Sequence, residues 1–496
     1  MFIERKSFGC KCNGNLYFDR SEGLRVTEQV LRRCGPFLKK VDASHLPLAS
    51  IVVLVAENCP GIRWIKCAEV CARGIEELRN SCTAIEGVDF SFTRADCEEV
   101  LGKFFASNRQ LVSVVLSLDA IGHCLTKLSV NNLKNLSIYS MDSRFVLENY
   151  AFLEEAENLE KLELTASDAT ICRSLKSLAS GCCLHLTALA LHLERSLQNM
   201  AENVDSLLTA VFERNRSIED LRLNSFIDLR GECFSALNKD RLRVLNLTSC
   251  FGLEQHHLTE TLLSTKFLED LDLSCNPSER DFDFLAPCLA SLGQLTRLTL
   301  HDATVAPDCL QRAVPALRNL RSIAYFEGPR SVTNEFCRSL ADSMPRLQEL
   351  DLTRNRLVTD AGLAAISELK HLRVLRLCHC TGIKKCELSG FRDLKDLSLK
   401  FCRIVDESRL VDFLRTNESL ELLDIEGLEL LDLDSCGSDP SESSYDSDQC
   451  EQEESYQLAK RIDRVARVAL TEFRRRPRGR GSLEVVTSFE YYHVWN

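Results

Sequence analysis

The residue types that most often carry chemistry are present in this 496-residue chain, but their spacing supports no catalytic site. Cys378-His379-Cys380 looks like a metal-site fragment, and Cys10-x-Cys12 has no second ligand pair at zinc spacing. The ten histidines are scattered, without a nucleophile in register. Neither a nucleophile elbow, a His-Glu-x-x-His pair, a Walker loop nor a Rossmann glycine cluster occurs. The sequence therefore predicts no enzyme, no catalytic residue, no cofactor and no metal ion.

The elements that must position any binding residues are short repeats of the pattern apolar-x-x-apolar-x-apolar. Sixteen copies lie between residues 38 and 425, and the steps between them average about 25 residues, as in leucine-rich repeats. The middle apolar residues, called anchors below, stand at positions 41, 65, 88, 114, 136, 162, 189, 221, 245, 271, 298, 323, 350, 375, 397 and 423.

One repeat shows why the pattern specifies a fold. Leu350 and Leu352 alternate with Asp351, which suits a short strand with one buried face. A helical stretch follows, in which Thr359 or Asp360 can cap the first turn and apolar residues can point inward. Such a unit buries its apolar face only against its neighbours.

The predicted fold class is therefore α/β, a right-handed leucine-rich-repeat solenoid, or horseshoe, of about 16 repeats. A parallel sheet would line its concave side and helices its outer side, followed by a partly disordered C-terminal tail. A doubly wound domain would need longer apolar strands and a Gly-rich phosphate turn, and the sequence has neither.

Composition indicates a soluble protein of the cytoplasm, the nucleus or both. No stretch reaches the roughly 18 apolar residues of a membrane span, and residues 1–6 lack the apolar core of a signal peptide. The 24 cysteines are then expected to be free thiols in a reducing compartment. The net charge of −12 argues against nucleic acid as a partner of the body of the chain.

Several repeats carry cysteine or asparagine three residues after the last strand leucine. A buried side chain in this slot can hydrogen-bond the backbone of the turn, which would build a structural ladder along the stack. The slot is occupied by Cys250, Asn276, Asn355, Cys380 and Cys402.

Binding residues are expected on the concave face, beside and just after the strand leucines. Aromatic and arginine side chains are common anchors of protein interfaces, and the mixed charges favour a protein or peptide partner. The alternative is a solvated face whose charges only keep the solenoid soluble. The candidates are Trp64, Phe92, Tyr139, His192, Arg222, Asp272, Arg297, Asp351, Arg354, Arg376, His379, Lys400 and Phe401.

The chain changes character after residue 425. The stretch 428–433 is expected to supply a last strand that covers the end of the core. Residues 436–456 form an acidic, Ser-rich linker predicted to be disordered, and a basic helix and an aromatic tail follow over 457–496. We expect the aromatic end of the tail to dock on another part of the protein. For the basic helix, one interpretation is that it packs on the last repeat, and another is that its arginine cluster folds back onto the acidic linker or the aspartates of the concave face. That cluster, a possible nuclear-localisation or nucleic-acid segment, is Arg474, Arg475, Arg476, Arg478 and Arg480.

The run Val358-Thr359-Asp360-Ala361-Gly362-Leu363, with cysteine in the ladder slot, resembles the cysteine-containing leucine-rich repeats of F-box proteins. The resemblance covers roughly residues 25–435. It implies a substrate receptor of a cullin–RING ubiquitin ligase, in which an F-box binds the adaptor. Residues 26–35 resemble the helix that leads from an F-box into the first repeat. No F-box pattern is visible in residues 1–25, which we assign as an N-terminal segment or cap, a possible remnant of an F-box.

Three functional hypotheses follow. The first is a substrate-recognition subunit related to SCF ubiquitin-ligase receptors, which binds a protein or degradation substrate on the repeats of residues 26–435 and connects to the adaptor and cullin. The second is an F-box-independent interaction scaffold or enzyme inhibitor. The third is a nuclear protein whose basic tail contacts nucleic acid. The sequence offers no obvious dimerisation element, so we expect a monomer.

Overall fold

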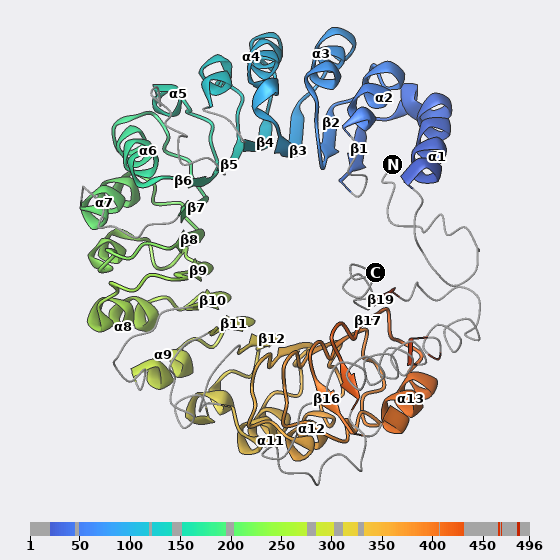
Figure 1. Cartoon of the computed structure of the whole chain (residues 1–496). Helices are drawn as coiled ribbons and strands as arrows, with labels where there is room; N and C mark the ends of the chain where they lie inside the picture. Colours follow the sequence, from blue (N-terminus) through green and yellow to red (C-terminus); the bar gives the residue numbers. More distant parts are fainter. Residues whose placement is uncertain are drawn as a thin grey trace, which may run out of the picture. The chain divides into compact units, whose positions relative to one another are not determined.

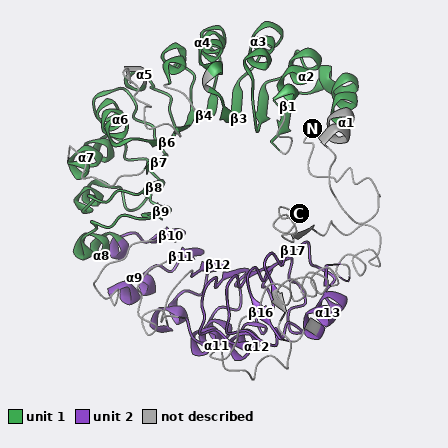
Figure 2. Ribbon diagram, in the orientation of Figure 1, with its two compact units in different colours: residues 1–261 green, residues 262–496 purple. Residues whose placement is uncertain are grey.

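The computed structural model of the chain describes residues 20–44, 49–118, 122–140, 151–194, 203–274, 284–301, 311–325, 332–405, 407–430, 465–466, 468 and 484–486. These residues divide between two compact units, residues 1–261 and residues 262–496 (Figure 2). In each unit parallel strands form a sheet, and the helices lie on one side of that sheet (Figure 1).

In the first unit each strand pairs in parallel with the next one along the chain. The strands lie on the inner side of a curve, and the helices lie outside it (Figure 1). The strands are β1 (Lys40–Ala43), β2 (Trp64–Cys67), β3 (Gly87–Thr93), β4 (Ser113–Leu118), β5 (Asn135–Ser140), β6 (Lys161–Ala166), β7 (Ala188–Leu193), β8 (Asp220–Asn224) and β9 (Val244–Asn246).

The connections between these strands run through short helices. The α-helices are α1 (Arg20–Cys34), α2 (Ser50–Asn58), α3 (Ala72–Ser81), α4 (Glu98–Ser107), α5 (Ala151–Glu154), α6 (Asp168–Ser180), α7 (Val204–Arg214) and α8 (Gln255–Ser264), which begins in this unit. Single 3₁₀ turns are η1 (Gly35–Phe37), η2 (Ala95–Cys97), η3 (His123–Lys127) and η4 (Glu232–Ala236).

The second unit repeats the arrangement with shorter strands. Its strands are β10 (Asp270–Asp272), β11 (Arg297–Thr299), β12 (Ser322–Ala324), β13 (Glu349–Asp351), β14 (Val374–Arg376), β15 (Asp396–Ser398), β16 (Arg403–Ile404), β17 (Leu422–Asp424), β18 (Glu429–Leu430) and β19 (Glu484–Val486). Its helices are α9 (Leu285–Ser291), η6 (Val314–Ala316), α11 (Asn334–Ser343), α12 (Asp360–Ile366) and α13 (Glu407–Thr416).

The anchors confirm the predicted solenoid. All sixteen lie in strands and are buried, and within each unit successive anchors pair directly, as Val41 does with Ile65 and Leu350 with Leu375. Because side chains alternate across a strand, this shared register buries one apolar row and leaves the flanking residues on the opposite side of the sheet. We call that solvent-facing side the strand face.

Carboxylates at helix starts connect consecutive repeats. Asp205 of α7 is buried, and its two carboxylate oxygens accept hydrogen bonds from the backbone N–H groups of Arg230, Gly231 and Cys233 at 2.8–3.1 Å. Asp360 of α12 accepts three backbone N–H groups, those of residues 384–386, in the same way. Of the two predicted caps, Thr359 and Asp360, the structure has Thr359 at the cap position, where its hydroxyl accepts from the Ala361 N–H. The aspartate therefore bridges to the next repeat while the threonine caps its own helix.

The end of the second sheet differs from the prediction. Residues 429–430 do not extend the main sheet but form β18, which pairs with β16 in a separate two-stranded sheet. The reason is their place in the repeat, because Glu429 and Arg403 both stand six residues after an anchor, beyond the turn. The strand that does extend the main sheet is β19, with Val485 in register with the anchor Leu423.

Two further predictions concern the tail. Residues 465–466 and 468 are helical and Val465 is fully buried, within the segment predicted as a basic helix. The acidic linker over 436–456 lies outside the described residues. Among the described helices, none is both long and apolar enough to cross a bilayer.

Candidate functional site

The ladder side chains form hydrogen bonds between neighbouring repeats. Asn355 donates from Nδ2 to the carbonyl oxygens of Tyr325 at 2.7 Å and Leu352 at 2.9 Å. Cys380 donates from Sγ to the Leu352 carbonyl at 3.0 Å, and Cys402 to that of Leu377 at 2.9 Å. These carbonyls lie at the strand ends, so each buried side chain links the turn of its own repeat to the end of the preceding strand.

A thiol can donate only while protonated. Burial raises the pKa of Cys402 and of Cys250 to about 12, so both remain thiols at neutral pH. Cys250 Sγ lies 3.4 Å from the carbonyl oxygen of Leu223 in the first unit. Asn276, the fifth predicted ladder residue, lies outside the described residues, as do Cys10, Cys12 and the five tail arginines.

Two aromatic residues, Trp64 and Phe92, belong to the first strands of the first unit. Trp64 of β2 lies over Gly87 of β3, where an added Cβ atom would sit 2.2 Å from the indole ring. The Lys40 ammonium lies 6.0 Å from the same ring, at the limit of a cation–π contact. Phe92, 39% exposed, lies at the far end of β3. The glycine at 87 is therefore required by the tryptophan beside it.

Tyr139 and His192 come together around Glu163, which the sequence did not single out. Burial, and then a hydrogen bond with Glu163, raise the pKa of Tyr139 above its usual range. His192 Nε2 lies 3.8 Å from a Glu163 carboxylate oxygen, yet burial dominates and lowers the pKa of His192. Arg222 adds to that lowering, and its guanidinium also pairs with Asp220 at 2.8 Å. These side chains form a polar network on β5–β8.

Two predicted binding residues of the second unit also have a structural role. Asp351 accepts hydrogen bonds from the backbone N–H and the hydroxyl of Thr353, and Asp272 does the same with Ser274. Each carboxylate thus closes the turn that follows its own strand. Arg297 lies within 4 Å of carboxylates of Asp270 and Glu349, so its charge is balanced along the strand face.

The position four residues after the anchor has a left-handed backbone in several repeats. Arg354, His379 and Phe401 have φ values of 62°, 56° and 54°, and Gly427 occupies the same place in the next repeat with φ 62°. Ser225 and Ser249 occupy it in the first unit. Left-handed conformations disfavour residues with a Cβ atom, bulky ones most, and glycine would remove this penalty.

Backbone hydrogen bonds hold this row in place. The N–H groups of Arg354, His379 and Phe401 donate to the carbonyls of Cys378, Lys400 and Glu426 at 2.7–2.9 Å. Each acceptor lies in the next repeat, so the turns are locked together along the stack. The repeat thereby projects one large side chain per turn from a fixed backbone.

The row ends in a compact aromatic and charged cluster. The rings of His379 and Phe401 stack with centroids 4.6 Å apart, and Phe401 is 40% exposed. The ammonium of Lys400 lies 5.5 Å from the Phe401 ring and also pairs with Glu426. Arg376, on the neighbouring strand face, pairs with Asp396 at 3.0 Å. We call Arg354, Arg376, His379, Lys400 and Phe401 the αL cluster, after the left-handed backbone of Arg354, His379 and Phe401.

Sequence reasoning missed Gly427, which completes the cluster. A Cβ atom there would lie 2.3 Å from two ring carbons of Phe401. The sequence contains the information needed to find it, because Gly427 and Phe401 each stand four residues after the anchor of their repeat. Cys378-His379-Cys380 separates into a ladder thiol at 380, a stacked imidazole at 379, and Cys378 within 3.1 Å of the Ser398 hydroxyl.

Comparisons with known proteins found similar chains among the solved structures. No family model matches the chain. A chain of the TLR13–ssRNA13 complex is similar at 17% identity and a TM-score of 0.45, covering 75% of this chain and 57% of that chain. A chain of the Rad7–Elc1 complex in yeast is similar at 15% identity and a TM-score of 0.41, and the match covers 87% of this chain and 95% of that chain. The present chain thus spans little more than half of the TLR13 chain.

Proposed function

We propose that the chain is a protein-binding adaptor and that the αL cluster is its principal binding surface. The observation that carries this proposal is the left-handed row of Arg354, His379 and Phe401. Each costs about 1–3 kcal/mol in backbone strain that glycine would relieve. Strained large side chains exposed on a rigid scaffold suit recognition, where a preorganised anchor loses little entropy on binding.

The chemistry of the cluster defines the kind of partner. Phe401 and His379 offer a flat, half-exposed aromatic surface, and the Lys400 ammonium lies 5.5 Å from the Phe401 ring. Arg354 and Arg376 add cations from the two preceding repeats. A protein segment with an apolar or aromatic residue next to a carboxylate would fill both requirements. Acidic neighbours such as Asp396 and Glu426 oppose a polyanionic partner, because they already pair with Arg376 and Lys400.

The test compares partners captured by the full chain and by matched variants. Tagged wild-type protein, the double variant His379→Ala/Phe401→Ala and the control Phe251→Ala are used to isolate partners from a eukaryotic lysate. Phe251 is 53% exposed and lies outside the cluster. We expect a partner to be retained by the control and weakened in the double variant by about 2 kcal/mol, roughly thirtyfold in Kd. Identical partner sets and affinities for all three proteins would contradict the proposal.

We further propose that this adaptor is a substrate-recognition subunit of an SCF-type ubiquitin ligase. Support comes from the resemblance over residues 25–435 and from the cysteine ladder that such repeats share. Co-isolation of the F-box-binding adaptor and a cullin with the wild-type chain is the expected result, and it should survive in the His379→Ala/Phe401→Ala variant. Recovery of a partner that depends on the αL cluster, without adaptor or cullin, would favour the alternative of an F-box-independent scaffold or inhibitor.

A further inference from the structure

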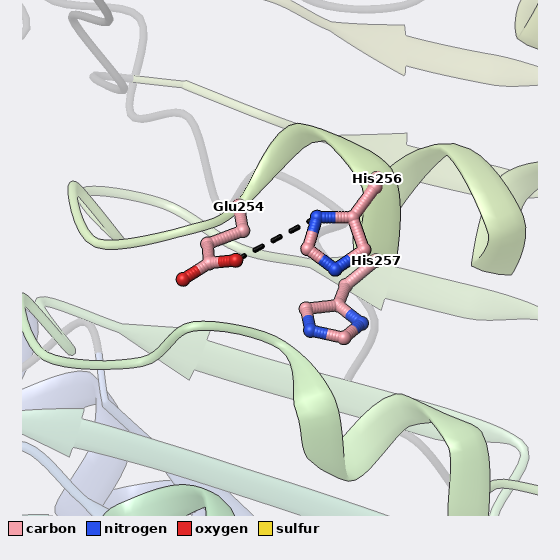
Figure 3. A group of neighbouring side chains, drawn as sticks. All are labelled: Glu254, His256 and His257. Carbon is pink, nitrogen blue, oxygen red and sulfur yellow. Dashed lines mark ion pairs between the residues drawn. The ribbon is translucent and has the colours of Figure 1, made fainter.

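We propose that Glu254, His256 and His257 form a binding site for a divalent transition-metal ion such as Zn²⁺. The three residues lie at the start of α8, in the first unit and away from the αL cluster in the sequence (Figure 3). This inference is independent of the proposed adaptor function. It rests on the convergence of three ligand side chains within four consecutive residues.

The ligand atoms are already close to one another. One ligand atom from each residue lies within 4.8 Å of the other two. His256 Nδ1 is 3.6 Å from a Glu254 carboxylate oxygen, and the two imidazole rings have centroids 3.8 Å apart at an angle of 40° (Figure 3). Adjacent residues of a helix normally direct their side chains about 100° apart, so this approach of the two rings is specific to the site.

The donor set matches a metal with a preference for nitrogen and oxygen. Tetrahedral zinc with bonds of about 2.1 Å places its ligand atoms about 3.4 Å apart. The ligand atoms therefore need to approach one another by at most about 1.4 Å, within the reach of small χ rotations. Two imidazoles and one carboxylate leave the fourth position open to water, as in zinc sites with three protein ligands.

The backbone beneath the ligands is held by the previous repeat. The Glu254 N–H donates to the Arg230 carbonyl at 3.0 Å, and the buried Leu258 anchors the first turn of α8 in the core. A Cβ atom added at Gly231 would lie only 3.3 Å from the Cβ atom of His257, so the absence of a side chain at Gly231 leaves room for His257. Gly231 has φ +95°, a conformation that favours glycine, so the room for His257 is part of the turn.

Charge explains why the carboxylate is needed. The start of a helix carries a partial positive charge of about half an elementary charge, which opposes a cation. Glu254 offsets that field, and it is still 40% exposed, so an ion can reach it from solvent. Neutral imidazoles alone at this position would bind a cation more weakly.

The test uses Co²⁺ as a probe, because its absorption distinguishes nitrogen and oxygen ligands from thiolates. Purified full-length wild-type chain is titrated with Co²⁺ and then with Zn²⁺ as competitor. We expect one tight equivalent with visible d–d bands and without the near-ultraviolet band of sulfur-to-cobalt charge transfer. His256→Gln and His257→Gln should each weaken binding by more than about tenfold.

A surface histidine elsewhere provides the control. His371 is exposed and outside the cluster, so His371→Gln should bind the ion as the wild type does. His256 is 68% exposed, so its replacement should leave the unfolding temperature of the metal-free chain unchanged. The inference is overturned if the bound equivalent shows thiolate charge transfer, or if both cluster variants retain wild-type affinity.

Discussion

The imidazole of His379 lies against the ring of Phe401, with centroids 4.6 Å apart and planes 19° from parallel. Both residues occupy the left-handed position of consecutive repeats, and Gly427 continues the series beneath the Phe401 ring. The stack is thus a product of repeat geometry, since residues at equal distances from paired anchors must lie side by side.

Gly427→Ala should move the Phe401 ring without altering any charge of the cluster. The new methyl group would lie 2.3 Å from the ring, and the alanine would adopt φ near +62°. We expect the free energy of unfolding to fall by about 1–3 kcal/mol and partner affinity to fall with it. Denaturant unfolding and a binding titration measure the two effects.

Gly293→Ala is the matched control for that experiment. Nothing lies within 4 Å of the position its Cβ would take. It should therefore leave both stability and binding close to wild type. Equal effects of the two alanines on binding would show that the Phe401 ring position does not matter.

Replacing ladder residues should destabilise the chain in proportion to the number of side-chain hydrogen bonds removed. Asn355→Ala removes a donor shared by the carbonyls of Tyr325 and Leu352, whereas Cys402→Ala removes one bond, to Leu377. We expect losses of about 2–3 kcal/mol for the first and about 1 kcal/mol for the second. Cys402→Ser keeps a donor and should lie nearer the wild type. A reversed order in denaturant unfolding would contradict the ladder model.

Asp205 should be among the most sensitive polar positions of the first unit. Asp205→Ala leaves three backbone N–H groups of the next repeat without their acceptor, which should lower the unfolding free energy by roughly 2–4 kcal/mol. Asp205→Asn keeps one acceptor oxygen and should have an intermediate effect. Thermal and chemical unfolding of the three proteins provide the ranking, and equal stability of Ala and Asn variants would refute the bridge.

His192 should contribute a pH dependence to stability. Its pKa in the folded chain is lowered, mainly by burial, so the folded state resists protonation more than the unfolded state does. Stability from this group is fully present above the ordinary histidine pKa of about 6.5 and is lost as the pH falls through the lower folded pKa. The unfolding free energy of His192→Gln should accordingly decline less than that of wild type between about pH 7.5 and 5. A pH-independent difference between the two proteins would argue against this assignment.

Strand β19 should protect the edge of β17. Val485→Pro removes a backbone N–H from the strand that pairs with residues 422–424. We expect faster amide hydrogen exchange in residues 422–424, with little change in β10–β13. Unchanged exchange at β17 would mean that β19 does not hold that edge in solution.

The sequence predicted the strands well because each is specified locally. Leu350, Leu375 and their counterparts recur at a regular distance and have only one buried face, so their register could be read from the pattern. The strand at Val485 was not predicted, because its pairing with Leu423 follows no repeat. Asp351 illustrates the limit for sites, since its place on the strand face was expected but its bond to Thr353 depends on turn geometry.

The Glu254, His256 and His257 group was missed for a related reason. The spacing Glu-x-His-His is visible in the sequence, but whether consecutive side chains converge depends on rotamers and on the space left by Gly231. Likewise, the stack of His379 on Phe401 requires a left-handed backbone at both positions, and a bulky residue such as phenylalanine rarely adopts that conformation.

Leu423 and Val485 are paired although 62 positions separate them, whereas the other paired anchors stand 22 to 32 positions apart. During synthesis on a ribosome, earlier rungs of the solenoid can therefore form one by one as each short repeat emerges. The β17 edge is different, because its partner is translated only after the whole acidic and basic tail. Until then the nascent chain presents an open strand edge, the kind of surface that chaperones bind and that other chains can join.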